Sequence, residues 1–574
     1  MGIFCASRAG LFVTAYTGDR AILLAFDLDK DKTDELAGFS IAVAAPGKKP
    51  GGSKPYYLSN RLNFADKVTA GTPYNADLWT PSDVAPFQSF HWTHYPSQGF
   101  GTYTYTVTAQ YFSDRSTLKF GPSVDVVAAL LPPAQGTLEL GFTRTMISSQ
   151  AYAHTFKNAG LHPEPQTVGF DTAQYQKQYE WLGAHAREMI VTFLEKCTND
   201  AKTTLDVFAF DFNEPDVIRS LCGLGKRARV FQDNSASHAW PESAAEDMRR
   251  PAQKSDTKPP LEPDTVLALR AAGVQVRTGH FSGLAHNKVM IRRRNGNAEA
   301  VLTGSANFTL RGLYVQANSV LIFEEPQVAG LYAQAFDQAW AAPAKFKASP
   351  IATGWHDLNL GGIRHSFSFA PHKAPFPLDS IREAIGSAKQ SVLFAMMQMR
   401  GSGDAIGAIE DLPSREDLFS LGIIQNKGDI ALFKPDTGDQ NFTLASSAYL
   451  SKNVPPPFDR EISGGAGQVI HHKIVICDFN GENPVVFCGS SNLAAGGEIK
   501  NGDNLMAIYD PDVAVRYAVE AIRLYDHFRF RSLQEGSTGK SPLQLKKNAD
   551  WVKPYYEPGS IRYRERLALA GRPE

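Results

Sequence analysis

The 574-residue chain has few cysteines, no excess of basic residues and no long hydrophobic run. An odd, sparse set of cysteines argues against a disulfide framework and is compatible with a reducing compartment. A net charge of −1 at pH 7 argues against a protein that holds nucleic acid mainly by bulk electrostatic attraction, although it leaves a local basic cleft open. The spacing of the five cysteines matches no metal-binding pattern: Cys5, Cys197, Cys222, Cys477 and Cys488.

No stretch of the sequence approaches the roughly 18 apolar residues of a membrane-spanning helix. The first five residues carry no basic start before the short apolar run at 11–15, so they do not form a secretory signal pattern. Ala6 stands where a myristoylation signal has Ser or Thr. We therefore expect a soluble protein without a transmembrane segment, located in the cytoplasm or exported without a recognisable signal peptide.

What the sequence does contain is one polar pattern twice, 185 residues apart (471 − 286). The first copy has His-Asn-Lys at 286–288 and Gly-Ser-Ala-Asn at 304–307; the second has His-His-Lys at 471–473 and Gly-Ser-Ser-Asn at 489–492. The first His and the last Asn are 21 residues apart in both copies (307 − 286 and 492 − 471). Either half of the pattern alone is usually an ordinary strand or turn. Two copies at one spacing indicate a duplicated unit whose halves face each other across one site.

Each copy predicts two buried strands. Apolar runs at 289–291 and 474–476 follow the two lysines, and runs at 300–302 and 485–487 precede the two Gly-Ser-x-Asn segments. Because side chains alternate along a strand, the His and Lys of each copy project to one side. The glycine permits a tight turn, and the small Ser and Asn offer donors to an anion. Two imidazoles, two ammonium groups and two amides at one place suit a phosphodiester.

These residues resemble the phospholipase D superfamily, whose signature is His-x-Lys-x4-Asp followed by Gly-Ser-x-Asn, usually present twice. The second copy matches throughout, with Asp478 as the motif Asp and Ser490 in the turn. The first copy keeps Ser305 but has Arg293 where the motif has Asp, which puts the geometry of that half in question. The resemblance covers about residues 165–535.

The resemblance implies a two-step reaction without a metal or other cofactor, in which a histidine forms a covalent phosphohistidine that water or another alcohol then resolves. It assigns the attack on phosphorus to His286, and the roles of general acid and then general base to His471. It implies that the lysines and asparagines bind the phosphate oxygens. The predicted catalytic set is His286, Lys288, Asn307, His471, Lys473, Asn492 and Asp503, with Ser305, Asp478, Ser490, Gln316 and Asn318 in support.

The two histidines are predicted to have different partners. Members of this family tend to carry a carboxylate after Gly-Ser-x-Asn that orients the histidine of the opposite half, and Asp503 stands where that group belongs for His286. The comparable stretch of the first half offers only Gln316 and Asn318. His471 would then lack a charged partner and be less basic, which suits a proton donor.

Other polar residues near the motifs have plainer interpretations. His472 is expected on the opposite face of its strand, with a structural role. Glu498 is expected to be a solvated carboxylate in a loop. No spacing in the sequence assigns a role to His238, His280 or His372.

The expected architecture is multidomain. Residues 1–155 predict a β-sandwich, because threonines alternate with aromatic and apolar residues at 102–111 and Pro and Gly turns separate further short strands. This part is similar to a fibronectin type III module. Strands and helices then alternate, which predicts two α/β phospholipase D-like lobes over 165–345 and 350–574. They would be pseudo-twofold duplicates, each a mixed sheet with flanking helices.

The motif residues leave the substrate open, because phospholipases, phosphatidyl transferases and nucleases of this superfamily share them. Two fused copies and near-neutral charge favour a hydrolase of phospholipid diesters at a membrane surface. A nuclease acting on DNA or RNA at the same site is the first alternative, and phosphatidyl transfer is another. A scaffold protein with a defunct site is disfavoured, because both His-x-Lys pairs and both asparagines are retained. The oligomeric state stays open, since the two halves complete a site within one chain.

Overall fold

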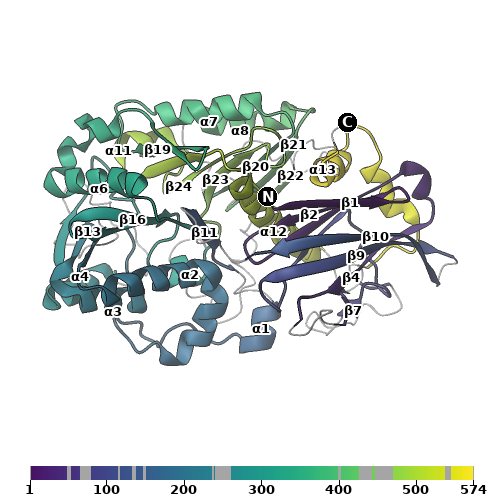
Figure 1. Cartoon of the computed structure of the whole chain (residues 1–574), viewed down its shortest axis with the longest axis horizontal. Helices are drawn as coiled ribbons and strands as arrows, with labels where there is room; N and C mark the ends of the chain where they lie inside the picture. The colour runs from purple at the N-terminus through teal and green to yellow at the C-terminus, as the bar shows by residue number, and fades with distance from the viewer. Residues whose placement is uncertain are drawn as a thin grey trace.

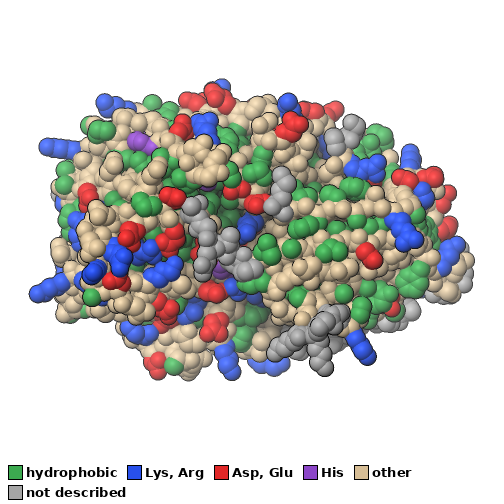
Figure 2. All heavy atoms as spheres, viewed as in Figure 1, with side chains coloured by type: hydrophobic (Ala, Val, Ile, Leu, Met, Phe, Trp, Pro, Cys, Tyr) green, Lys and Arg blue, Asp and Glu red, His purple; other side chains and the backbone are tan. Residues whose placement is uncertain are grey.

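The computed structural model shows β-sheets at one end of the molecule and two larger sheets with their helices at the other (Figure 1). None of the helices in the described part of the chain is long and apolar enough to cross a bilayer. Acidic and basic side chains are interspersed over the face shown in Figure 2. The structure describes residues 2–47, 54–64, 79–113, 117–131, 138–145, 150–235, 238, 260–397, 403–425, 443–446, 469–536 and 544–572.

Two four-stranded antiparallel sheets occupy the N-terminal part and share one hydrophobic core. In β9 (Gly101–Phe112), a central strand of the second sheet, alternate residues such as Tyr103, Tyr105 and Val107 enter this core. One face of this strand is therefore buried. The likeness to fibronectin type III stays a prediction. One sheet has the order β1 (Ile3–Arg8), β2 (Leu11–Thr17), β3 (Ile22–Leu28), β8 (His91–His94), and the other has β10 (Leu118–Leu130), β9 (Gly101–Phe112), β4 (Leu36–Ala44), β5 (Tyr56–Tyr57); β6 (Ser59–Asn60) pairs with β7 (Thr80–Pro81).

A seven-stranded mixed sheet carries the first motif copy. The predicted apolar runs at 289–291 and 300–302 lie in two adjacent antiparallel strands of this sheet and are buried. Its strand order is β11 (Leu138–Phe142), β17 (Ser319–Phe323), β16 (Asn297–Gly304), β15 (Val289–Arg294), β12 (Thr203–Ala209), β13 (Ala228–Asp233), β14 (Gln275–Gly279). The helices around it are α1 (Gln150–Phe156), α2 (Gln176–Asn199), α3 (Pro215–Leu224), α4 (Glu262–Ala271), α5 (Leu310–Tyr314) and α6 (Pro326–Ala341).

An eight-stranded mixed sheet carries the second motif copy, and the predicted runs at 474–476 and 485–487 form two of its central strands. Its order is β18 (His356–Leu360), β19 (Ile363–Phe369), β25 (Asn504–Ile508), β24 (Val485–Gly489), β23 (Lys473–Cys477), β20 (Ser391–Met396), β21 (Phe419–Ile424), β22 (Thr443–Ser446). The helices of this part are α7 (Phe376–Ser387), α8 (Asp404–Glu410), α11 (Ala495–Lys500) and α12 (Pro511–Gly536). The 3-10 helices among the described residues are η1 (Lys30–Lys32), η2 (Ala173–Tyr175), η3 (Gly225–Arg227), η5 (Pro343–Ala348), η6 (Pro350–Ala352), η7 (Leu412–Ser414) and η9 (Ala549–Tyr555).

The two large sheets meet at a seam of two isolated parallel bridges. Ala285 pairs with Gly502, and Ala317 pairs with Ile470. The two bridges are related to each other by the motif offset. Ala285 corresponds to Ile470 and Ala317 corresponds to Gly502, each 185 residues later (470 − 285 and 502 − 317). Residues immediately after each bridge therefore face the other sheet. This seam is where the motif histidines lie.

Two segments pack with a different part of the molecule from the rest of their predicted range. β11 falls within the predicted range 1–155, but it pairs with β17 in the seven-stranded sheet, because Leu140 and Phe142 bury their side chains in that sheet's core. The C-terminal η9 packs Val552 and Tyr555 into the N-terminal core, although the range 350–574 assigned it to the second lobe. The C-terminus accordingly lies beside the N-terminal sheets in Figure 1, where α13 (Ile561–Ala570) contacts β3.

Candidate active site

The motif histidines are placed by the seam between the sheets. His286 directly follows the bridge at Ala285 and precedes β15, and His471 directly follows the bridge at Ile470 and precedes β23. Asn504 strengthens the seam by donating from Nδ2 to Oδ1 of Asn287, at 2.8 Å. The predicted residues of both halves thus come from opposite sheets to one buried region. Their burial limits solvent access, which strengthens the electrostatic interactions among them.

His286 is held by the carboxylate expected from the sequence. Its Nδ1 lies 2.7 Å from Oδ1 of Asp503, and the same oxygen accepts a 2.7 Å hydrogen bond from Oγ of Ser490. Burial alone would raise the pKa of Asp503, but His286, Lys288 and Ser490 lower it below its usual value. An ionised carboxylate only accepts, so the proton of neutral His286 resides on Nδ1. Nε2 is left with its lone pair available for attack.

His471 is held by an amide at the matching position of the other half. Its Nδ1 lies 2.9 Å from Oδ1 of Asn318, which also accepts a 2.8 Å hydrogen bond from Oγ of Ser305. Burial lowers the pKa of His471 well below its ordinary value, and the nearby Lys473, Lys288 and His286 lower it further. Burial also lowers the pKa of His286, but there Asp503 opposes the effect. The histidine without a carboxylate partner, His471, is thus the one whose pKa is lowered further below its ordinary value.

Asn318 and Gln316, two predicted supporting residues of the first half, make different kinds of contact. Asn318 contacts His471 and donates from Nδ2 to the backbone oxygen of Gly312 at 2.8 Å. Gln316, which the sequence grouped with it, contributes its backbone oxygen to a 2.7 Å hydrogen bond from Oγ1 of Thr143. Asn318 is thus the member of the pair that orients the histidine.

Both motif lysines are buried with their ammonium groups beside the backbone of the preceding histidine. Lys288 donates to the oxygen of His286, and Lys473 donates to the oxygen of His471 at 2.7 Å. Burial lowers the pKa of Lys288 to about 8, although Asp503 and other nearby carboxylates oppose this. Burial also lowers the pKa of Lys473 well below its ordinary value. An ammonium group has three donors, so each lysine keeps donors for a phosphate oxygen.

The two motif asparagines differ in their surroundings. Asn307 donates from Nδ2 to Oδ2 of Asp211, a residue that the sequence did not single out. Asp211 in turn contacts His238, which bridges to Asp233. The buried Oδ1 atoms of both Asn307 and Asn492 have no hydrogen-bond partner within the described part of the chain. The two asparagines lie on the Gly-Ser-x-Asn turns that follow β16 and β24.

Four residues near the site were missed or misinterpreted in the sequence. Asp211 follows β12 and Asp233 ends β13, and polar residues after buried strands are the signal that could have drawn attention to them. His238, to which no spacing assigned a role, is bound by both. The expectation of a solvated Glu498 is wrong: it is 1 % exposed and accepts a hydrogen bond from Ser491. Burial raises the pKa of Glu498 to about 8.

The motif Asp of the second copy supports the backbone away from the histidines. Asp478 accepts hydrogen bonds from the backbone nitrogens at 389–391, at 2.7 to 3.1 Å, just before β20. In the first copy Arg293 instead pairs with Asp206 at 2.7 Å and Asp337 at 2.8 Å. The His286 contacts form without a motif Asp, so this departure leaves the geometry of the first half intact. His472 is fully buried beside Glu520, consistent with a structural role.

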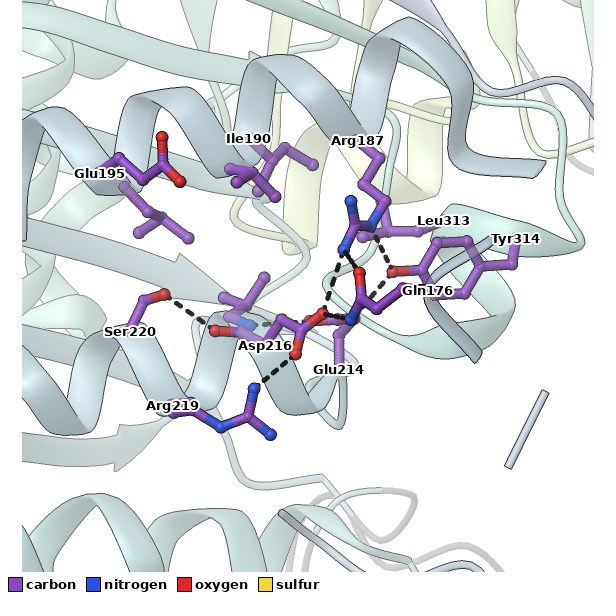
Figure 3. A pocket seen from close by; sticks show the side chains of 13 residues that line it. Gln176, Arg187, Ile190, Glu195, Glu214, Asp216, Arg219, Ser220, Leu313 and Tyr314 are labelled. Carbon is purple, nitrogen blue, oxygen red and sulfur yellow. Dashed lines mark hydrogen bonds and ion pairs between the residues drawn. The ribbon is translucent and has the colours of Figure 1, made fainter. Parts of the chain in front are cut away.

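A cavity of about 190 Å³ is lined by residues of α2, α3 and α5. Figure 3 shows Arg187 pointing toward Glu214, Asp216 and Tyr314 between α2, α3 and α5. Burial raises the pKa of Glu214 to about 7. The backbone nitrogen of Glu214 donates to the oxygen of Phe308, which directly follows Asn307. This polar network therefore supports the turn that carries the first motif asparagine.

Comparisons with known proteins agree with the motif. Residues 194–340, which include the first motif copy, match the family model described as cardiolipin synthase, PLD-like domain. The chain is 26 % identical over 155 residues to mitochondrial cardiolipin hydrolase of Xenopus laevis and 28 % identical over 155 residues to that of Xenopus tropicalis. Each match covers 26 % of this chain and 61 % of the relative, so the chain spans about three fifths of the length of these relatives.

Among solved structures, phosphatidylserine synthase of Haemophilus influenzae Rd KW20 aligns with a TM-score of 0.38 and 12 % identity, covering 67 % of this chain and 91 % of that chain. The match of the PLD-like domain spans β12 to β17, the strands that carry the first motif copy. Residues 194–340 are thus similar to a PLD-like domain of the cardiolipin synthase type.

Proposed function

We propose that this protein is a phosphodiesterase that hydrolyses phospholipid diesters through a phosphohistidine, without a metal. The observation that carries the proposal is the pairing of His286 with Asp503 across the seam, opposite His471 with Asn318. The two histidines have the same orientation through Nδ1 but partners of different charge. Such a pair suits one nucleophile and one proton carrier.

In the first step, Nε2 of His286 attacks phosphorus and the bond from phosphorus to the leaving oxygen breaks. The leaving oxygen takes a proton from Nε2 of His471. In the free protein the lowered pKa of His471 leaves it mostly neutral at pH 7. A bound diester anion favours the protonated imidazole, so substrate binding itself promotes protonation of His471. Lys288 and Lys473 hold the non-bridging oxygens, where charge builds up in the transition state.

In the second step, a water molecule attacks the phosphohistidine. Neutral His471 accepts a proton from this water, the bond from phosphorus to Nε2 of His286 breaks, and a phosphate monoester leaves. Asp503 stabilises the positive charge that His286 carries while it is phosphorylated. The reaction balances with the diester and water as its only consumed reactants.

We also propose that the two large sheets are duplicated lobes. The order β17, β16, β15, β12, β13, β14 in the first sheet parallels the order β25, β24, β23, β20, β21, β22 in the second. The two bridges at the seam share the motif offset of 185 residues (470 − 285 and 502 − 317). The predicted division into 1–155, 165–345 and 350–574 stays a proposal, with β11 and η9 crossing it as described.

Two observations support a phospholipid substrate. The matching family model and relatives carry the names of cardiolipin synthase and cardiolipin hydrolase. The net charge of −1 and the interspersed charges in Figure 2 give no broad basic face for a nucleic acid backbone on that side.

The test is release of head groups from mixed phospholipid vesicles that include cardiolipin, in excess chelator. We expect release by the wild type, none by His286→Ala, and wild-type release by His356→Ala, a matched change of a histidine on β18. Cleavage of DNA or RNA without head-group release would show that the substrate assignment is wrong. Cleavage of neither would contradict the phosphodiesterase itself, and loss of release in chelator would contradict a metal-free reaction.

A further inference from the structure

We propose that Asp211, together with His238 and Asp233, is a positioning unit of the active site that fixes the amide of Asn307 and keeps a negative charge beside the two motif lysines. The inference rests on the proposed function, because it assigns these residues a task at the same phosphate site. None of the three belongs to the repeated motif. They are brought to it by the ends of β12 and β13.

The contacts form a continuous chain from one motif residue to the backbone beside another. Oδ2 of Asp211 accepts from Nδ2 of Asn307, and its Oδ1 lies 2.5 Å from Nε2 of His238. Nδ1 of His238 lies 2.9 Å from Oδ1 of Asp233. Oδ2 of Asp233 then accepts a 2.7 Å hydrogen bond from the backbone nitrogen of Ala285, the residue before His286. The unit therefore holds both the binding amide and the start of the nucleophile's segment.

The unit is buried on its inner side and open at Asp211. The side chains of His238 and Asp233 are 3 % and 0 % exposed, whereas that of Asp211 is 38 % exposed. Burial opposes protonation of His238, but the two carboxylates raise its pKa to about 10. The imidazolium can therefore donate from both nitrogens and fix both carboxylates. Phe210 packs edge-on to His238 and His286, with ring centroids 4.4 and 4.7 Å away.

Asp211 fixes which end of the Asn307 amide faces the substrate. An ionised carboxylate only accepts hydrogen bonds, so the atom next to it must be the amide nitrogen. Nδ2 has two hydrogens, and the second remains for a phosphate oxygen. With an amide in place of the carboxylate, Asn307 can flip and present its oxygen to the phosphate, which repels it.

The second half has a neutral residue where the unit has Asp233. Gln425 follows β21 as Asp233 ends β13, and its Oε1 accepts from the backbone nitrogens of Val469 and Ile470 at 2.8 and 3.0 Å. Both side chains thus hold the segment before a motif histidine. Only the half that carries the predicted nucleophile uses a charged group for this.

The charge of Asp211 also bears on the lysines. Lys288 is faced by His286 and Lys473 and by the carboxylates of Asp503, Asp211 and Asp233. Burial lowers the pKa of Lys288 to about 8, and these three carboxylates oppose that. Burial lowers the pKa of Lys473 as well, and Asp503 and Asp211 oppose it. Anion binding needs protonated lysines, so it is lost as pH rises through their pKa, and removing a carboxylate moves that loss to lower pH.

The test measures binding of sulfate, whose charge is constant from pH 6 to about 9.5, by calorimetry across that range. For Asp211→Asn we expect an affinity about tenfold lower at pH 8 and a loss of binding that begins at lower pH than in the wild type. For His238→Gln, which removes a positive charge, the loss should begin at higher pH. Asp337→Asn is the control, because it removes an exposed carboxylate of the same lobe that pairs with Arg229 and Arg293.

Opposite pH shifts in the two variants would support the positioning unit, since a merely structural role predicts no such opposition. Sulfate binding by Asp211→Asn that matches the wild type and Asp337→Asn would overturn it, as would shifts in the same direction. Thermal unfolding of each variant identifies any loss of sulfate binding that misfolding causes. If Asp211→Asn misfolds, the shift of binding loss to higher pH in His238→Gln remains the decisive result. Sulfate binding does not require turnover, so failure of the proposed hydrolysis would appear separately, as absence of diester cleavage by the wild type.

Discussion

Replacing His286 with alanine should lower kcat/KM for diester hydrolysis by about a thousandfold or more. The substitution removes the only atom proposed to bond to phosphorus, while Lys288 and Asn307 still bind the phosphate oxygens. The loss should therefore fall on kcat, with little change in KM. Steady-state kinetics with bis(p-nitrophenyl) phosphate separate the two quantities without the complication of a vesicle surface.

The control for this loss is chemical rescue. Alanine leaves space where the imidazole stood, so added imidazole should restore part of the activity of His286→Ala and none of that of a variant with an unrelated defect. The His356→Ala variant should match the wild type throughout, because His356 bonds to the backbone of Ile351 away from the seam. Retention of more than about a tenth of the wild-type kcat by His286→Ala would show that another group attacks phosphorus.

Replacing Asp503 with asparagine should lower kcat by about a hundredfold or more with a nearly isosteric change. The carboxylate lies within hydrogen-bond distance of Nδ1 of His286. In the proposed mechanism it also compensates the positive charge of the phosphorylated imidazole. An amide in its place can turn its NH2 group toward Nδ1 and so stabilise the wrong tautomer. The pH dependence should change too: Asp503 supports protonation of Lys288 and Lys473, so activity should decline at lower pH than in the wild type.

Matched measurements separate this role from a structural one. Asp337→Asn removes a carboxylate outside the site and should leave both kcat and the pH profile unchanged. Asp503 is buried and receives hydrogen bonds from His286 and Ser490, so thermal unfolding must accompany the kinetics. A folded Asp503→Asn variant with wild-type kcat and pH profile would contradict the assignment of Asp503 to His286.

The meeting of the two motif histidines at one site could be predicted because it follows from a repeated spacing. Strands of alternating pattern fix which side chains share a face, and a duplicated unit brings the two faces together. The resemblance to the phospholipase D superfamily pointed to Asp503 for His286 and left Gln316 and Asn318 as the comparable residues of the first half. The structure brings Asp503 to His286 and Asn318 to His471 within hydrogen-bond distance.

The positioning unit could not be predicted in the same way. Asp211, Asp233 and His238 have no common spacing with the motif, and they meet only because β12 and β13 are parallel neighbours whose ends lie at one edge of the sheet. Glu498 was misjudged because a Gly-rich segment resembles a surface loop, whereas its side chain turns inward to Ser491. The range 1–155 includes β11, which pairs with β17 of the seven-stranded sheet, because a range drawn from local pattern does not say which strand a segment joins.

The central claim is that His286 carries the phosphoryl group, and mass spectrometry of the His471→Ala variant tests it most directly. With bis(p-nitrophenyl) phosphate the leaving group needs no acid, so the first step should proceed, while the second step lacks its base and the adduct should accumulate. We predict a p-nitrophenyl phosphoryl group on the peptide containing His286, and none in the double variant that also has His286→Ala. An adduct on any other residue, or product burst without an adduct on His286, would contradict the account.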